Sequence, residues 1–287
     1  MKIFTEIAPL KAYLRDSKCQ GKSVGLVPTM GALHEGHLAL FRTSVAQNDL
    51  TVGSIFVNPI QFNNPGDLEK YPRTLKKDTE LLESVGCDVL FCPDVSEMYP
   101  EEATVKLDFG SLDKTMEGKF RPGHFSGVAL VVSKLFNIIQ PDNAYFGQKD
   151  WQQFAIIRKL TRELNFDIQL HSVETLRADD GLALSSRNAR LTPEERKRAT
   201  VFYRALVTAR ESLLQGNSTT ETRAKVLALV EKEPGVRLEY FEVADSQNLN
   251  ALEYVHQSER PILCVAGYVG EVRLIDNMFV KHPDAQK

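Results

Sequence analysis

Two histidines three residues apart form the pair of side chains with the clearest chemical meaning. His34 and His37 flank Glu35 and Gly36, and they are two of only six histidines in the chain. An imidazole can donate a hydrogen bond to a phosphate oxygen and can carry a positive charge near neutral pH. Because negative charge grows on phosphoryl oxygens during displacement at phosphorus, donors fixed beside them lower the barrier. The pair therefore indicates chemistry at a phosphate group.

The residues around this pair predict a strand, a turn and a helix. Residues 24–27 are an apolar run typical of a strand covered on both faces, and Pro28 is expected to end its hydrogen bonding because proline has no N–H. Gly31 lets the backbone bend after the strand. Apolar residues then recur at helical spacing after His37. A helix N-terminus at such a turn offers free N–H groups and a positive dipole end to an anion.

A chance pairing or a zinc site would account for the two histidines less well than a phosphate-binding site does. Two surface histidines could meet by chance, but here glycines at positions 31 and 36 mark a strand-to-helix turn. A zinc protease would have the spacing His-Glu-x-x-His, whereas this stretch is His-Glu-Gly-His with no cysteine nearby. We therefore expect no metal site formed by protein ligands.

Further polar groups that suit a nucleotide lie elsewhere. Lys149 could neutralise a phosphate, and Asp150 could hold Mg²⁺ or simply cap a helix. Residues 184–188 place two hydroxyls and an arginine in one loop; arginine binds phosphate oxygens bidentately, although the loop could equally be a solvated turn. Gln61 and Gln153 could hydrogen-bond a hydroxy acid, but two neutral amides are not specific evidence.

Strands that alternate with helices up to about residue 175 must position these groups. Strands are expected at residues 24–27, 50–57, 88–91, 144–147 and 168–173, and residues 1–22 are expected to form a charged helix with turns. This alternation predicts an α/β fold, a parallel sheet with helices on both faces. Ligands of such sheets bind outside the carboxyl ends of the strands. His34, Asn58, Gln61 and Lys149 follow strands, so one cleft could gather them.

The pattern changes after about residue 175. Thr192, Pro193 and Glu195 form a strong helix start, with a capping box, and that helix is expected to run towards Gly216. A second helix is expected at residues 220–231, and strands are expected at residues 236–243, 261–268 and 271–279. We therefore predict one domain at residues 1–175 and a smaller α+β domain with an antiparallel sheet at residues 176–287.

Composition narrows the class of protein. The chain has 287 residues, 25% of them charged, and a net charge of −3, so no broad attraction to nucleic acid or membrane is expected. Residues 1–6 lack the apolar core of a signal peptide, and no apolar run is long enough to span a bilayer. The four scattered cysteines (Cys19, Cys87, Cys92 and Cys264) are expected to be reduced thiols of a cytoplasmic protein.

Five stretches together resemble one enzyme family. His34-Glu35-Gly36-His37 is similar to the His-x-Gly-His signature of the nucleotidyltransferase superfamily, and the longer run of residues 28–37 resembles the pantoate–β-alanine ligases, or pantothenate synthetases. The other four stretches that resemble this family are residues 58–62, 121–125, 146–153 and 177–188. They occur in the family's order and spacing. Trp151 stands where the family often has a different aromatic residue.

The resemblance implies a fold and a reaction. The fold would be a Rossmann-like N-terminal domain that binds nucleotide and pantoate, with a smaller C-terminal lid domain, in a homodimer. The reaction would be the ATP-dependent condensation of D-pantoate with β-alanine to pantothenate. It would pass through a pantoyl adenylate and release pyrophosphate and AMP. Mg²⁺ would be bound mainly by the phosphates of ATP.

The resemblance also assigns roles to residues. His34 and His37 would stabilise charge at the α-phosphate, with His37 as the candidate proton donor. Lys149 and Arg187 would act with them at the phosphates. Gln61 and Gln153 would hold pantoate, with Gln61 near the place where β-alanine enters. The residues that would line the ATP site are Met30, Gly31, Ala32, Leu33, His34, Glu35, Gly36, His37, Gly147, Gln148, Lys149, Asp150, Leu176, Leu184, Ser185, Ser186 and Arg187.

Three rival functions remain to be weighed. Another nucleotidyltransferase, acting on a phosphate-bearing substrate, would share His34 and His37 but would want cations where Gln61 and Gln153 stand. A nucleotide-sensing module would bind ATP without turnover. A nucleic-acid binder is disfavoured by the acidic balance of the chain.

Overall fold

The structure is a computed structural model that describes residues 1–63 and 65–281. The contacts divide the chain into two compact units. Unit 1 comprises Met1–Gly147 and Ile156–Glu174, and unit 2 comprises Gln148–Ala155 and Thr175–Lys287. The short segment Gln148–Ala155 therefore belongs with the C-terminal part of the chain. The assignment of nucleotide- and pantoate-binding and lid roles to residues 1–175 and 176–287 stays a prediction.

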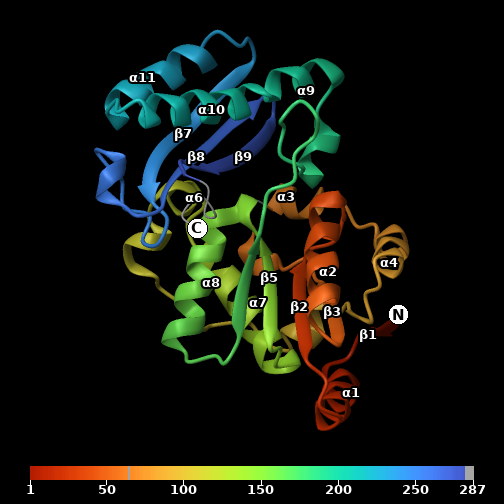
Figure 1. Cartoon of the computed structure of the whole chain (residues 1–287). Coiled ribbons are helices and arrows are strands. Elements are labelled where there is room, and N and C mark those ends of the chain that lie inside the picture. The colour runs from red at the N-terminus through yellow and green to blue at the C-terminus, as the bar shows by residue number, and fades with distance from the viewer. Residues whose placement is uncertain (64, 282–287) are drawn as a thin grey trace. The chain divides into compact units, whose positions relative to one another are not determined.

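Unit 1 is built on a six-stranded parallel sheet (Figure 1). Its strands are β1 (Lys2–Phe4), β2 (Val24–Thr29), β3 (Leu50–Ile55), β4 (Val89–Phe91), β5 (Asn143–Gly147) and β6 (Gln169–Val173). They lie in the order β1-β4-β3-β2-β5-β6, and each neighbouring pair is parallel. The predicted parallel sheet is confirmed.

Helices cover both faces of this sheet, as predicted. The main ones are α1 (Ile7–Cys19), α2 (Glu35–Gln47), α4 (Leu75–Ser84), α7 (His124–Ile139) and α8 (Trp151–Glu163), of which only Ile156–Glu163 lie in unit 1. Helices α2 and α4 connect strands in one direction along the sheet, whereas α1, α7 and α8 connect them in the other. Because such crossovers are right-handed, the two sets lie on opposite faces. Phe41 of α2, Leu82 of α4 and Leu90 of β4 share one buried cluster.

Shorter helices occupy some of the connections between these strands and helices. They are α3 (Pro65–Glu69), α5 (Val95–Met98) and α6 (Met116–Phe120), with 3₁₀ turns η1 (Pro59–Gln61) and η2 (Gly110–Asp113).

Two local predictions for unit 1 were wrong. Residues 2–4 form the edge strand β1 instead of part of a helix, because their pairing comes from β4, far away in the sequence. Pro28 does not end its strand: β2 continues to Thr29, and Pro28 pairs in register with Ser54 of β3. Pairing of β2 with β5 covers Gly25 and Leu26. Pro28 therefore lies where the strand has a partner on one side, so its missing N–H is tolerated.

The direction of the chain along the sheet reverses between β2 and β5. From β2 the chain continues to β3 on one side, and from β5 it continues to β6 on the other. Such a topological switch point leaves a crevice outside the carboxyl ends of the two central strands, where ligands of these folds bind. His34 follows β2 and Gly147 ends β5. The sheet therefore places the histidine pair and Gly147 at its predicted ligand-binding edge.

Unit 2 contains a three-stranded antiparallel sheet covered by helices. The sheet has the order β7 (Val236–Asp245), β8 (Pro261–Val269), β9 (Val272–Phe279), and the helices are α9 (Pro193–Ala199), α10 (Val201–Leu214) and α11 (Thr219–Val230). Phe202 of α10 and Val265 of β8 lie in its buried core. The predicted α+β architecture and the capping box of Thr192 and Glu195 are confirmed. The single helix expected from this start is instead two helices that meet at Thr200.

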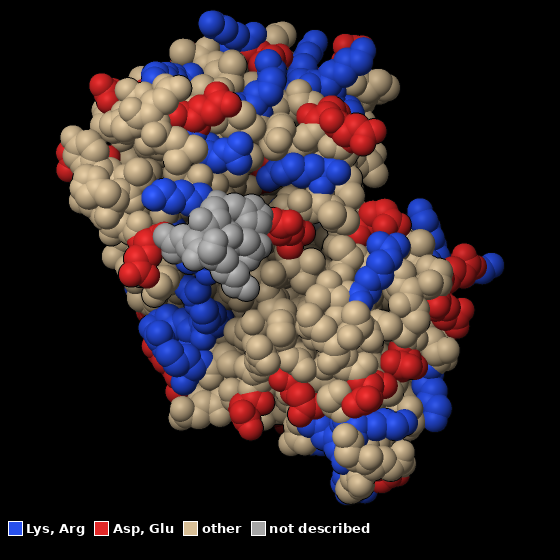
Figure 2. All heavy atoms as spheres, viewed as in Figure 1, with Lys and Arg blue, Asp and Glu red and all other residues tan. Residues whose placement is uncertain are grey.

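The surface shows no segregation of charge on the face in view. Figure 2 shows lysine and arginine side chains interspersed with aspartate and glutamate. Within residues 1–63 and 65–281, no helix combines the length and apolar character needed to cross a membrane. All four cysteines, which lie in this described part, are free thiols.

Candidate functional site

The two histidines meet at the N-terminus of α2. His34 is the N-cap residue, with extended backbone, and its Nδ1 accepts a hydrogen bond from the N–H of Gly36 at 3.1 Å. The ring centroids of His34 and His37 lie 4.0 Å apart. Both side chains are half-buried. The predicted pair is thus presented together at a helix N-terminus, where backbone N–H groups and the helix dipole already favour an anion.

The turn before the histidines has an unusual backbone. Gly31 has a φ of 80°, and the next residue, Ala32, has a φ of 52°. An alanine in this left-handed region is strained and needs support from its surroundings. A Cβ added to Gly31 would lie 3.1 Å from both the Oδ2 atom of Asp78 and the side chain of Ile55. The turn is therefore both strained and closely packed.

Asp78 of α4 supplies the support. Its carboxylate accepts hydrogen bonds from the N–H groups of Ala32 at 2.9 Å and Leu33 at 2.8 Å, and from the hydroxyl of Thr74 at 3.1 Å. Only 1% of Asp78 is exposed. Sequence reasoning missed this residue, because a single aspartate in an amphipathic helix gives no sign of a partner 45 residues away.

Gln61 lies beside the same turn. The amide Nε2 of Gln61 is 2.9 Å from the Sδ atom of Met30, and its Oε1 accepts a hydrogen bond from Asn58. A thioether is a weak acceptor. The N–H groups of Gln61 therefore remain suited to a better acceptor, such as a carboxylate or hydroxyl of a ligand. The structure thus brings Gln61 and Met30 together; their assigned roles stay predictions.

Several buried groups hold Gln61 and Asn58 in place. The backbone oxygen of Gln61 is 2.8 Å from Nδ1 of His124, and Asn58 donates to the oxygen of Gly127 at 3.0 Å. A Cβ on Gly127 would lie 2.9 Å from the backbone of Gln61. The hydroxyl of Tyr99 donates to Asn58, and burial raises the pKa of Tyr99 to about 12, so it stays a donor at neutral pH.

The remaining predicted residues belong to unit 2. Gln148, Lys149 and Asp150 form the 3₁₀ turn η3 (Gln148–Asp150), and Gln153 follows in α8. The side-chain amide of Asn277 in β9 donates to the backbone oxygens of Gln148 at 2.8 Å and Lys149 at 2.7 Å. Strand β9 thus holds the turn that carries Lys149.

The loop at residues 176–187 is closed on itself. Leu184 donates a backbone hydrogen bond to Leu176 at 2.9 Å, and the hydroxyl of Ser185 accepts one from the N–H of Arg187 at 3.3 Å. Ser186 and Arg187 begin the 3₁₀ turn η4 (Ser186–Arg190). Both η3 and η4 contact β9. In unit 2, the turn that carries Lys149 and the turn that carries Ser186 and Arg187 therefore both lie against strand β9.

The predicted site residues fall into two groups. In unit 1 they are Met30–His37, Gln61 and Gly147; in unit 2 they are Gln148, Lys149, Asp150, Gln153, Leu176, Leu184, Ser185, Ser186 and Arg187.

The donor set suits phosphate better than a metal. In the part of the chain that the structure describes, no group of three or more His, Cys, Asp or Glu side chains is placed to hold a metal ion. Lysine, arginine and serine side chains supply cations and hydroxyl donors, which bind phosphate oxygens.

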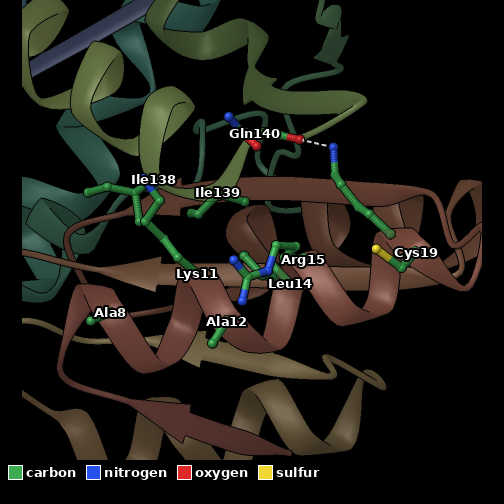
Figure 3. Close-up of a pocket in the computed structure, with 10 residues that line it drawn as sticks. Ala8, Lys11, Ala12, Leu14, Arg15, Cys19, Ile138, Ile139 and Gln140 are labelled. Carbon is green, nitrogen blue, oxygen red and sulfur yellow. Dashed lines mark hydrogen bonds between the residues drawn. The ribbon is translucent and has the colours of Figure 1, made fainter.

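A groove of about 590 Å³ elsewhere in unit 1 contains none of these residues. It is lined by α1 and the end of α7, with Lys11 and Arg15 on one side and Ile138 on the other (Figure 3). The side chain of Lys18 donates to the backbone oxygen of Gln140 beside it. The groove is therefore separate from the candidate site.

Comparison with known proteins gives one consistent answer. The profile of the family described as pantoate-beta-alanine ligase matches residues 2–279. The chain is 48% identical to pantothenate synthetase of Bacteroides fragilis over 281 residues, covering 98% of this chain and 99% of the relative. It is 47% identical to that of Carboxydothermus hydrogenoformans over 283 residues, with 98% and 99% covered.

Solved structures agree with these relatives. The crystal structure of pantothenate synthetase from Thermus thermophilus matches with a TM-score of 0.92 and 43% identity, covering 98% of this chain and 100% of that one. The ligase from Francisella tularensis, crystallised with beta-gamma ATP and beta-alanine, matches with a TM-score of 0.80 and 35% identity, covering 98% of each chain.

Proposed function

This chain belongs to the pantoate–β-alanine ligase family, and from that premise we propose how its residues carry out the reaction. The enzyme condenses D-pantoate with β-alanine to pantothenate at the expense of ATP. The observation that supports the proposed site most directly is the pair His34 and His37 at the N-terminus of α2, beside the switch point of the sheet. A rival nucleotidyltransferase that binds a phosphate-bearing substrate gains no support, because Gln61 and Gln153 are neutral amides.

The first step activates the carboxylate of pantoate. A carboxylate resists attack by an amine because it is anionic and has no good leaving group. We propose that one of its oxygens attacks the α-phosphorus of ATP. The new P–O bond forms as the bond to the β-phosphate breaks, and pyrophosphate leaves. His34 and His37 stabilise the charge on the α-phosphoryl oxygens. His37 is the candidate proton donor at this phosphate.

The other predicted residues bind and orient the reactants. Lys149, Ser185, Ser186 and Arg187 grip the phosphates through charge-assisted hydrogen bonds. Gln61 and Gln153 hold pantoate by hydrogen bonds. Residues Met30–His37, Gly147, Gln148, Asp150, Leu176 and Leu184 complete the ATP site in this proposal.

The second step forms the amide bond. The neutral amine of β-alanine attacks the acyl carbon of pantoyl adenylate. The bond from that carbon to the adenylate oxygen breaks, AMP leaves, and the nitrogen loses a proton. Gln61 lies near the β-alanine in this proposal. Mg²⁺ bound to the phosphates would neutralise part of their charge when ATP binds. We further propose, from the family resemblance, a homodimer located in the cytoplasm.

One assay separates these steps. Exchange of labelled pyrophosphate into ATP should require D-pantoate and should occur without β-alanine, because it reports the first step alone. Addition of β-alanine should then release AMP. Pyrophosphate exchange that does not depend on pantoate would contradict the adenylate mechanism. So would AMP release in the presence of all three substrates if no pyrophosphate exchange occurs with ATP and pantoate alone. ATP binding with no turnover would favour a sensing module.

A further inference from the structure

We propose that Asn277 and Asp276, next to each other in strand β9, are positioning residues for the phosphate-binding residues of unit 2. This inference rests on the proposed function for the role of Lys149. The two residues lie 127 or more positions beyond Lys149, outside the five short stretches on which the resemblance was first based.

Asn277 holds the backbone of the turn η3. Its side-chain nitrogen donates one hydrogen to the oxygen of Gln148 at 2.8 Å and the other to the oxygen of Lys149 at 2.7 Å. Both acceptors are carbonyl oxygens, so the amide must point its nitrogen towards them. Only 2% of Asn277 is exposed. The two bonds therefore fix two successive peptide groups, one on each side of the Cα atom of Lys149.

Asp276 holds the loop at residues 176–187 through Arg177. Its carboxylate forms a bidentate pair with Arg177, at 2.6 Å and 3.0 Å. Arg177 also donates to the backbone oxygen of Gly181 at 3.1 Å and to that of Asn277 at 3.0 Å. Gly181 is packed so closely that an added Cβ would lie 2.1 Å from the ring of Tyr203. Arg177 thus links Asp276 and Asn277 of β9 to the loop that leads to Leu184, Ser185 and Arg187.

The two contacts are coupled. The backbone N–H of Asn277 donates to the carboxylate of Asp276 at 2.8 Å, so the side chain of Asp276 is held against the backbone of the residue whose own side chain holds η3. Lys149 and the loop at residues 176–187 meet at this pair, although they are far apart along the chain. A shift of about 1 Å in a group that binds a reacting phosphate can cost up to roughly 100-fold in rate. Loosening the pair should therefore harm ATP chemistry more than the use of β-alanine.

The chain contains its own optical reporter for this segment. Trp151, the single tryptophan, lies two residues after Lys149. It is buried, its Nε1 donates to the backbone oxygen of Ser246 at 2.9 Å, and its ring contacts that of Phe279 edge to face at 4.9 Å. Fluorescence of Trp151 therefore reads out whether the segment Gln148–Ala155 is held, independently of catalysis.

The test compares Asn277→Ala with a control in the same sheet. Glu239→Gln weakens the ion pair of Glu239 with Arg273, at 2.9 Å, which is another largely buried link between strands of this sheet. We expect Asn277→Ala to lower kcat/KM for ATP in pyrophosphate exchange by about 10-fold or more, while KM for β-alanine stays within about twofold. Acrylamide quenching of Trp151 should increase in Asn277→Ala and stay unchanged in Glu239→Gln.

A double-mutant cycle separates positioning from general loss of stability. If Asn277 acts through Lys149, Asn277→Ala should cost little further activity in the Lys149→Ala background. The proposal would be overturned if the losses of activity caused by Asn277→Ala and Lys149→Ala added up in the double variant. It would also be overturned if Asn277→Ala impaired the use of ATP and of β-alanine equally, or if it left acrylamide quenching of Trp151 unchanged. If Asn277→Ala does not fold, Asn277→Ser, which keeps a hydroxyl donor, replaces it. Absence of pyrophosphate exchange in the wild-type protein would refute the proposed function, whereas the quenching comparison would still decide the positioning role.

Discussion

The carboxylate of Asp78 accepts a hydrogen bond from the backbone N–H of Ala32, at 2.9 Å, and thereby holds an alanine in the left-handed region of the backbone. We predict that Asp78→Asn lowers pyrophosphate exchange by roughly 10- to 100-fold, because the turn that presents His34 loosens. The melting temperature should also fall, since a buried donor loses its acceptor. Glu80→Gln, an exposed change on the same helix, is the matched control and should alter neither quantity.

Normal exchange by a folded Asp78→Asn protein would show that the turn keeps its shape without the carboxylate. Thr74→Val, which removes one hydrogen bond to Asp78 and leaves the backbone bonds, should give a smaller loss in the same direction.

The histidine pair itself should be essential for the first step and dispensable for folding. We expect His34→Ala and His37→Ala each to reduce the rate of adenylate formation by about 10²–10³, the usual cost of removing a transition-state donor. Because both rings are half-buried, both variants should stay folded, and His34→Ala should lower the melting temperature slightly since it removes the cap bond to Gly36. His256→Ala, at an exposed histidine in unit 2, should keep full exchange activity. Wild-type turnover by both His34 and His37 variants would remove their assigned roles.

His171 should make stability depend on pH. Burial lowers the pKa of His171 below its ordinary value of 6.5. As the pH falls below that value, the unfolded chain takes up a proton that the folded chain does not, so the free energy of unfolding should decrease. Urea unfolding at about pH 7.5 and about pH 5.5 measures the difference, and His171→Gln should reduce it. An equal pH dependence in that variant would assign the effect to other groups.

The cysteines should differ sharply in reactivity. Burial raises the pKa of Cys87 to about 12, so almost no thiolate exists there at neutral pH, whereas the side chain of Cys19 is exposed. Titration with Ellman's reagent should therefore label Cys19 in the folded protein and Cys87 only after unfolding. Cys19→Ser should remove the early reaction. Early labelling of Cys87 would indicate that the sheet around it opens locally.

Local sequence patterns predicted the parts of the fold whose causes are local. The apolar run at residues 24–27, the turn at Gly31 and the helix that contains His37 appear as expected, because strand, turn and cap signals lie within a few residues of one another. Thr192 and Glu195 form the predicted capping box for the same reason.

Contacts between distant residues escaped the same reading. Asp78 and Asn277 support the histidine turn and the Lys149 turn, yet an aspartate in a helix and an asparagine in a strand have no local pattern that names a partner. The edge strand β1 was missed because β4 supplies its pairing. The expectation that Pro28 ends its strand was wrong for a similar reason. Pro28 is tolerated because β5 pairs only with Gly25 and Leu26 of β2, and the local sequence does not show where that pairing stops.

The chain enters unit 2 at Gln148, leaves it after Ala155 and returns at Thr175, so three junctions connect the two units. A fragment that stops before Thr175 would carry Trp151 without Ser246 or Phe279, and its indole would lose both partners. No single cut therefore divides this enzyme into halves that each keep a complete interior. A chimera between two relatives would have to exchange the eight-residue insert together with the C-terminal part to preserve these contacts.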